Sequence, residues 1–140
     1  MTSYTDIIEK IETTLDSVAG IQKIYAYPLG ENEKPEKYPC AVFFPELVDN
    51  SMESVKANER TYRFRLVLLI QLNDTNAENI FTLVMPALVD STISAFDSDW
   101  HYGEASWAWV DTGEQGITIE SEGKVAFFRA TINIVVITDI

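Results

Sequence analysis

The stretch NERTYRFRLVLLIQL, residues Asn58–Leu72, decides how the rest of this chain is organised. Its even positions are apolar without interruption from Tyr62 onward, which predicts a β-strand because side chains alternate between the two faces of a strand. The odd positions begin with Arg63 and Arg65 and then become valine and leucine. We therefore expect one wet face along the first half and cover on both faces along the second. At about 3.3 Å per residue the stretch would span roughly 50 Å, so part of it should project beyond the domain or bend at a bulge.

The last strand of the chain repeats this pattern. Lys124–Thr138 has one apolar face at its even positions, and Val135 and Ile137 add apolar groups to the other face. Two such strands need cover on both sides, whereas the sequence predicts only two helices, which pack most naturally side by side on one face of an antiparallel sheet. The other face then needs a folded-over hairpin or another subunit. This leads to the hypothesis of an obligate oligomer.

Both helices are predicted from apolar positions at helical spacing. The first covers Ser3–Ala19, and Gly20 suits the C′ position that ends a helix. The second opens after Asn73–Asn76 and continues to Phe96, with Pro86 expected to kink it or split it in two. Its expected buried stripe consists of Ala77, Ile80, Phe81, Val84 and Leu88.

The other segments are shorter or polar. Pro45 is expected to place the end of one strand at a sheet edge or at a bulge. The fold class that follows is α+β, a mainly antiparallel sheet with two helices on one face, in a single domain over residues 1–140. The expected segments are a strand at Ile21–Tyr27, a loop at Leu29–Tyr38, a strand at Pro39–Leu47, a flexible arm at Val48–Ala57, and strands at Trp100–Asp111 and Ile117–Ser121.

The composition limits the classes of function. The formal net charge is −12 and is spread over the chain, so binding to nucleic-acid phosphates is disfavoured. Such a charge serves solubility or forms a surface that DNA passes without sticking. No apolar run is long enough to cross a membrane. Met1–Thr5 has no basic residue, which argues against a secretory signal and favours synthesis in the cytosol.

No motif points to catalysis, to a cofactor or to a metal. Cys40 is the only cysteine and lies in an apolar run, which is typical of a small buried residue. His101 is the only histidine and is expected either at the surface or with its hydrogen bonds satisfied. The carboxylates around it match no metal-loop spacing, and a solvated turn is the preferred interpretation. They are Asp97, Asp99, Glu104 and Asp111. We expect no catalytic, cofactor or metal site, and a carboxylate enzyme is the least supported alternative.

Arginines and tryptophans are the candidate contact residues. Trp107 and Trp109 share a strand face, where packing in the sheet or at a subunit contact is favoured over stacking on a sugar or base. Arg60, Arg63 and Arg65 stand at the wet end of the long strand. They either pair with acids across strands or form salt bridges with the acidic surface of a neighbour in a ring.

Two local motifs and the order of elements carry a resemblance to a known family. The motifs are the strand Tyr38-Pro39-Cys40-Ala41-Val42-Phe43-Phe44 and the strand entry Glu59-Arg60-Thr61-Tyr62-Arg63-Phe64. Over nearly the whole chain the layout resembles the tail terminator (tail-completion) proteins of long-tailed bacteriophages. Pro86 and the tryptophan-rich strand depart from the typical pattern. Head–tail joining proteins share much of the layout and stay as an alternative, as does a cellular α+β module that binds a small ligand or a partner through the Trp100–Trp109 strand.

The resemblance implies a structural protein of the virion, synthesised in the host bacterial cytoplasm. It implies a homohexameric ring that caps the tail tube, ends its polymerisation and offers a docking surface for the head. The implied partners are further copies of the chain, the tail tube protein and a head completion or connector protein, with DNA passing through the lumen and no membrane involved. The predicted subunit interface consists of Glu53, Lys56, Glu59, Arg60, Arg63, Arg65, Trp107 and Trp109.

Overall fold

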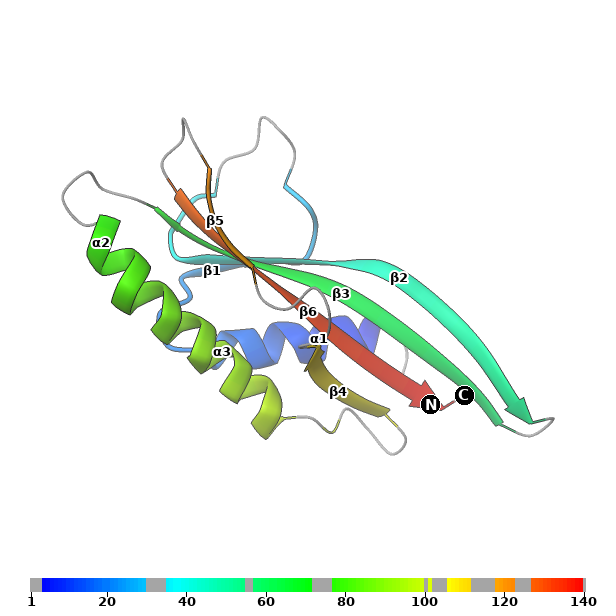
Figure 1. Cartoon of the computed structure of the whole chain (residues 1–140). Coiled ribbons are helices and arrows are strands. Elements are labelled where there is room, and N and C mark those ends of the chain that lie inside the picture. Colours follow the sequence, from blue (N-terminus) through cyan, green and yellow to red (C-terminus); the bar gives the residue numbers. More distant parts are fainter. Residues whose placement is uncertain are drawn as a thin grey trace.

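A β-sheet with helices on one face makes up the computed structural model, which describes residues 4–29, 35–54, 57–71, 77–99, 101, 106–111, 118–122 and 127–139. Within these residues the sheet is six-stranded, in the order β1-β2-β3-β6-β4, and β5 pairs with β6 (Figure 1). In chain order the elements are α1 (Tyr4–Asp16), β1 (Lys23–Tyr25), β2 (Cys40–Ser54), β3 (Ala57–Gln71), α2 (Ala77–Asn79), the π-helical turn η1 (Ile80–Val84), α3 (Met85–Ser98), β4 (Ser106–Asp111), β5 (Thr118–Glu122) and β6 (Phe127–Asp139). The predicted α+β class is confirmed.

The central strand is β3, which corresponds to the long apolar stretch of the sequence. It pairs antiparallel with β2 on one side and with β6 on the other. The β4 and β5 pairings with β6 are antiparallel too, whereas β1 runs parallel to β2. The prediction of a mainly antiparallel sheet is therefore confirmed, with one short parallel edge strand.

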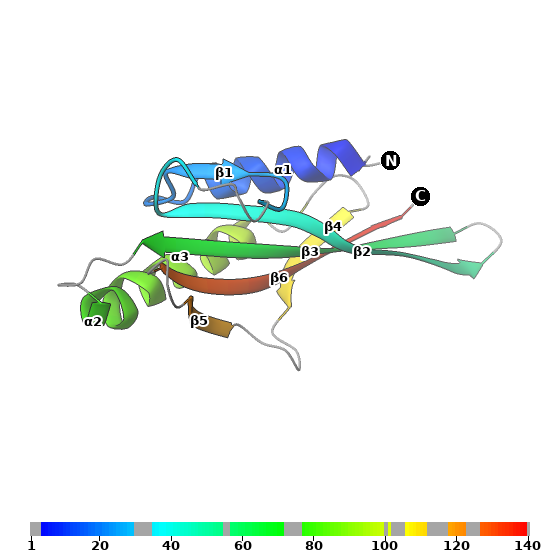
Figure 2. The same cartoon turned by 90° about the horizontal axis from the view of Figure 1, so that it is seen from above.

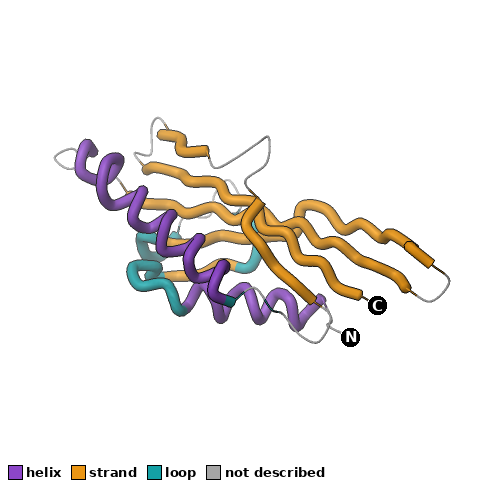
Figure 3. The backbone as a smooth tube through the Cα atoms, turned by 60° about the horizontal axis from the view of Figure 1, so that its bottom comes forward, coloured by secondary structure: helices purple, strands orange, loops and turns teal. Residues whose placement is uncertain are grey.

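The helices lie on one face of the sheet (Figure 3), and the main core lies between the helices and that face. The even positions of β3 from Tyr62 to Ile70 are all buried, as are Ile132 and Ile134 of β6. From the helix side the same core receives Ile7, Ile11, Leu15, Met85, Leu88, Val89 and Phe96. The period of two in the strands and the helical spacing in α1 thus predicted the correct faces.

A second, smaller core covers part of the helix-free face. Tyr25, Cys40, Val42 and Leu69 are buried there. The partly buried apolar residues packed against them are Leu29, Tyr38, Phe44 and Val67. Because Leu29 and Tyr38 belong to the connection between β1 and β2, the chain's own connection covers the second half of β3, where the sequence predicted a hairpin or another subunit. The expectation of cover on both faces is confirmed at Leu69.

The region expected to be a flexible arm, Val48–Ala57, is described at Val48–Ser54 and Ala57, and these residues belong to the paired strands β2 and β3. Strand β2 continues to Ser54 and β3 begins at Ala57, so the two project together beyond the rest of the sheet (Figure 2). The expected bulge is present, because the β2–β3 register shifts between Pro45 and Leu47. The polar composition suggested a loop, but a hairpin is held by backbone hydrogen bonds that place little demand on side-chain type.

Helix α1 ends earlier than expected. It stops at Asp16, and the chain continues as a turn in which the Ser17 N–H donates to the Thr13 carbonyl at 3.2 Å. Gly20 has φ 104°, a left-handed conformation that glycine adopts without strain, but it lies four residues after the helix rather than at the C′ position.

Pro86 splits the second helical region as predicted. It stands at the start of α3, directly after the π-helical turn η1. A π turn places one more residue in the turn than an α-helix does, which rotates the following side chains around the axis. The prediction that Val84 is buried is therefore wrong: Val84 is 38% exposed and Leu83 64% exposed, while Met85 is fully buried. Leu88 is buried as predicted.

The three C-terminal strands differ from the predictions mainly in their ends. The strand expected at Trp100–Asp111 is described only as β4, and Trp100 lies outside the described residues. The strand expected at Ile117–Ser121 is β5, and β6 covers most of Lys124–Thr138. No described helix is long and apolar enough to cross a membrane.

Candidate functional site

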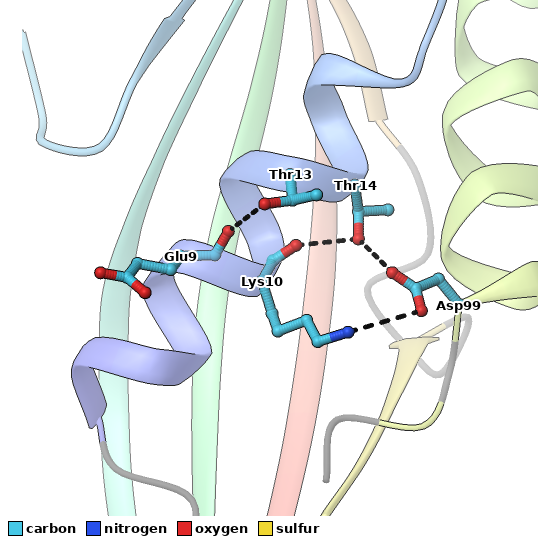
Figure 4. Close-up of polar contacts among 5 residues, drawn as sticks. All are labelled: Glu9, Lys10, Thr13, Thr14 and Asp99. Atoms are coloured by element: carbon cyan, nitrogen blue, oxygen red, sulfur yellow. Dashed lines mark hydrogen bonds and ion pairs between the residues drawn. The ribbon is translucent and has the colours of Figure 1, made fainter.

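One member of the predicted carboxylate cluster connects the two helices. Thr14 is only 3% exposed. Its hydroxyl is within donating distance of two acceptors, the Asp99 carboxylate at 3.0 Å and the Lys10 carbonyl at 2.9 Å (Figure 4). The Lys10 ammonium lies 4.0 Å from the same carboxylate. Asp99 thus fixes the end of α3 against α1. Asp97 is exposed, Asp111 is described only by its backbone, and Glu104 lies outside the described residues.

The only cysteine and the only histidine of the sequence lie in different environments. Cys40 is fully buried in the smaller core, and His101 is exposed after α3. Both placements agree with the predictions. Among the described residues no group of three or more His, Cys, Asp or Glu side chains is arranged to hold a metal ion.

Cys40 gives a prediction that depends on pH. Burial raises the pKa of the Cys40 thiol to about 11, whereas an unfolded thiol has a pKa of roughly 8.5. The contribution of the Cys40 thiol to the free energy of unfolding is therefore complete below the pKa of the unfolded thiol. It is lost as the pH rises through that value toward the pKa of the folded thiol. At pH 8.5 we expect iodoacetamide to alkylate the native protein at least roughly 100-fold more slowly than the urea-unfolded chain. Mass spectrometry follows the reaction, and equal rates in the two states would contradict the buried placement.

The three arginines of β3 do not share one face. The Arg60 guanidinium donates to the Tyr62 hydroxyl at 3.3 Å, on the helix side of the sheet. Arg63 and Arg65 are at odd positions and lie on the helix-free side, where Arg65 forms an ion pair with Glu46. For Arg65 the structure thus bears out the cross-strand pairing that the sequence left open. An exposed pair of this kind contributes little stability, about 1 kcal/mol or less.

Arg63 and Trp109 stand in one row across three strands. Arg63 is opposite Val135 of β6, and Val135 is opposite Trp109 of β4. Directly opposite residues share a sheet face, so the three lie on the helix-free side. Arg63 is exposed, Trp109 is 40% exposed, and Val135 between them is 2% exposed. We call Arg63, Val135 and Trp109 the arginine–tryptophan row.

The remaining predicted interface residues are placed only in part. Trp107 is opposite Ile137, next to the arginine–tryptophan row, and Glu59 is opposite Ser51 and Asp139. Glu53 belongs to the end of β2. Lys56 lies outside the described residues. The structure thus brings Arg63 and Trp109 together and separates Arg60 from them.

An apolar hollow that the sequence did not predict lies on the helix side. Its volume is about 370 Å³. The π turn exposes Leu83 and Val84, and these two side chains form part of the lining of the hollow. In the sequence, only Pro86 indicated that the helix is interrupted here. The hollow is lined by Ala19, Gly20, Pro39, Leu83, Val84, Ala87, Leu88 and Ser91.

Comparison with known proteins shows a shared fold. No protein-family model matches the chain, and no curated protein matches it. Among solved structures, a chain of the structure titled "Virion of native gene transfer agent (GTA) particle" is similar over 98% of this chain and 99% of that chain, with a TM-score of 0.58 and 12% identity. At this identity the likeness concerns the fold, which the two chains share from end to end.

Proposed function

We propose that this protein is a structural component of a phage-type virion that assembles into a ring at the end of the tail tube, where it ends tube polymerisation and offers the docking surface for the head. The observation that carries the proposal is the end-to-end likeness to a chain of a virion particle, at 98% and 99% coverage. The layout of elements that resembles tail terminators agrees with it.

The form of the subunit supports assembly with other copies. Strands β2 and β3 project beyond the rest of the sheet, and large apolar side chains are exposed on both sides of the molecule. Trp109 lies on the helix-free side, while Leu83 and Val84 lie on the helices. Exposed apolar groups of this size are typical of surfaces that other proteins cover.

The proposed role requires binding surfaces and no catalytic residue. Its partners are further copies of the chain, the tail tube protein and a head completion or connector protein. Because the net charge is −12, a lumen lined by this protein would repel the phosphates of passing DNA. A head–tail joining protein of the same layout is the second candidate, since the same fold likeness supports it.

Mass and shape in solution test the proposal. We expect light scattering to give a mass several times the 15.8 kDa of the chain, with sixfold rings in negative-stain images. A monomer or dimer at all salt and protein concentrations would contradict it. Tubes polymerised from the tail tube protein of the same gene cluster separate the two roles: a terminator binds the tube end and stops growth, whereas a joining protein leaves growth unchanged.

A further inference from the structure

The helices are strongly acidic, whereas the strands carry charges of both signs. Within the strand bounds the sequence places five bases and eight acids, and within the helix bounds it places seven acids and one base, Lys10. The five bases are Lys23, Arg60, Arg63, Arg65 and Arg129. The seven acids are Asp6, Glu9, Glu12, Asp16, Glu78, Asp90 and Asp97. The sheet is therefore not a basic face, and its positive charge is local, as at the exposed Arg63 of β3.

Among the described side chains of the helix-free face, the arginine–tryptophan row combines a large exposed apolar side chain, Trp109, with an exposed cation, Arg63. The smaller core covers the other half of this face with Leu29 and Tyr38. Trp109 and Arg63 lie on strands separated by β6. Two strand spacings place them about 10 Å apart. Tryptophan and arginine are the residue types that dominate the binding energy of interfaces.

The apolar hollow on the helix side has the matching properties. Its 370 Å³ fall in the range of pockets that hold small ligands, roughly 300–1,000 Å³, which leaves room for an indole ring. Its lining is apolar except for Ser91. Two exposed acids adjoin it in sequence, because Asp90 precedes Ser91 and Asp16 precedes Ala19 by three residues.

We infer that the occupant of this hollow is Trp109 of a second copy of the chain, with Arg63 of that copy against Asp16 and Asp90. The inference rests on the proposed function and names the contact that would hold the assembly together. The two surfaces belong to different faces of the subunit, so the contact is heterologous and leads to a ring when the rotation between copies closes. Apolar burial at Trp109 supplies affinity, and the charges fix the register.

Two charge-reversed variants test this contact. Variant A carries Arg63→Glu, and variant B carries Asp16→Lys and Asp90→Lys. All three positions are exposed, and a lysine near the end of α1 favours the helix dipole, so both variants should fold. In each variant alone like charges meet at every contact. We expect at least tenfold more protein to be needed for assembly, measured by light scattering, with the circular dichroism unchanged.

The equimolar mixture of A and B gives the decisive result. In an alternating ring the glutamate introduced into A would meet the lysines introduced into B, and Arg63 of B would meet Asp16 and Asp90 of A, so every contact is again complementary. We expect assembly near wild-type concentration, with equal amounts of A and B in native mass spectra. Assembly of either variant alone as readily as wild type, or no rescue in the mixture, would overturn the inferred contact. A wild-type chain that never assembles would instead contradict the proposed function itself.

Discussion

Replacing Phe64 by alanine is expected to lower the free energy of unfolding by about 3–5 kcal/mol, the range for a large aromatic residue removed from a packed core. Phe64 is fully buried in the middle of β3. Its ring centroid lies 6.2 Å from that of Phe43, 6.3 Å from that of Tyr4 and 6.4 Å from that of Tyr62. One side chain thus joins α1, β2 and β3. The loss is large because a small domain is stable by only about 5–15 kcal/mol in total.

Urea unfolding followed by circular dichroism measures this effect. Phe64→Leu keeps most of the volume and should cost only about 1 kcal/mol, which keeps the prediction testable when the alanine variant does not fold. Leu83→Ala is the control, since Leu83 is 64% exposed and its truncation should change stability by about 0.5 kcal/mol or less. A Phe64→Ala variant as stable as this control would show that Phe64 does not lie in the core.

The faces of the long strands could be predicted because a strand has a period of two and one face of β3 and β6 packs against the helices in the main core. Tyr62, Phe64 and Ile134 all follow that rule. The same rule, applied to Arg60, would have separated it from Arg63 and Arg65. The position of Arg60 on the side of Tyr62 thus follows from the period of two alone.

Other features depend on contacts that no local pattern reveals. The second face of β3 is covered by Leu29 and Tyr38, from a segment with no periodicity of its own. The exposure of Val84 depends on a π turn, and Pro86 indicates an interruption without saying that the helix gains a residue before it. The apolar hollow follows from this turn and from the end of α1, so it could not be predicted from the sequence of either segment alone.

Trp109→Ala is expected to raise the protein concentration needed for assembly about 30-fold or more, because truncating a central tryptophan of an interface typically costs at least about 2 kcal/mol. The fold should be unaffected, since Trp109 is 40% exposed and its strand neighbours Ala108 and Val110 supply the contacts with the core. Every contact of a ring contains one Trp109, so the loss is repeated at each of them.

A variant on the other side of the same contact should act in the same way. Ala87→Phe places a ring at the exposed lining of the apolar hollow and should block entry of the indole without disturbing the core. Val48→Ala is the matched control, because Val48 is 45% exposed and stands opposite Tyr62 in the β2–β3 hairpin, outside both surfaces. Sedimentation velocity across a concentration series compares the three variants with wild type. Normal assembly of both Trp109→Ala and Ala87→Phe would exclude the hollow as the docking site, whereas a defect in Val48→Ala alone would move the contact to the hairpin.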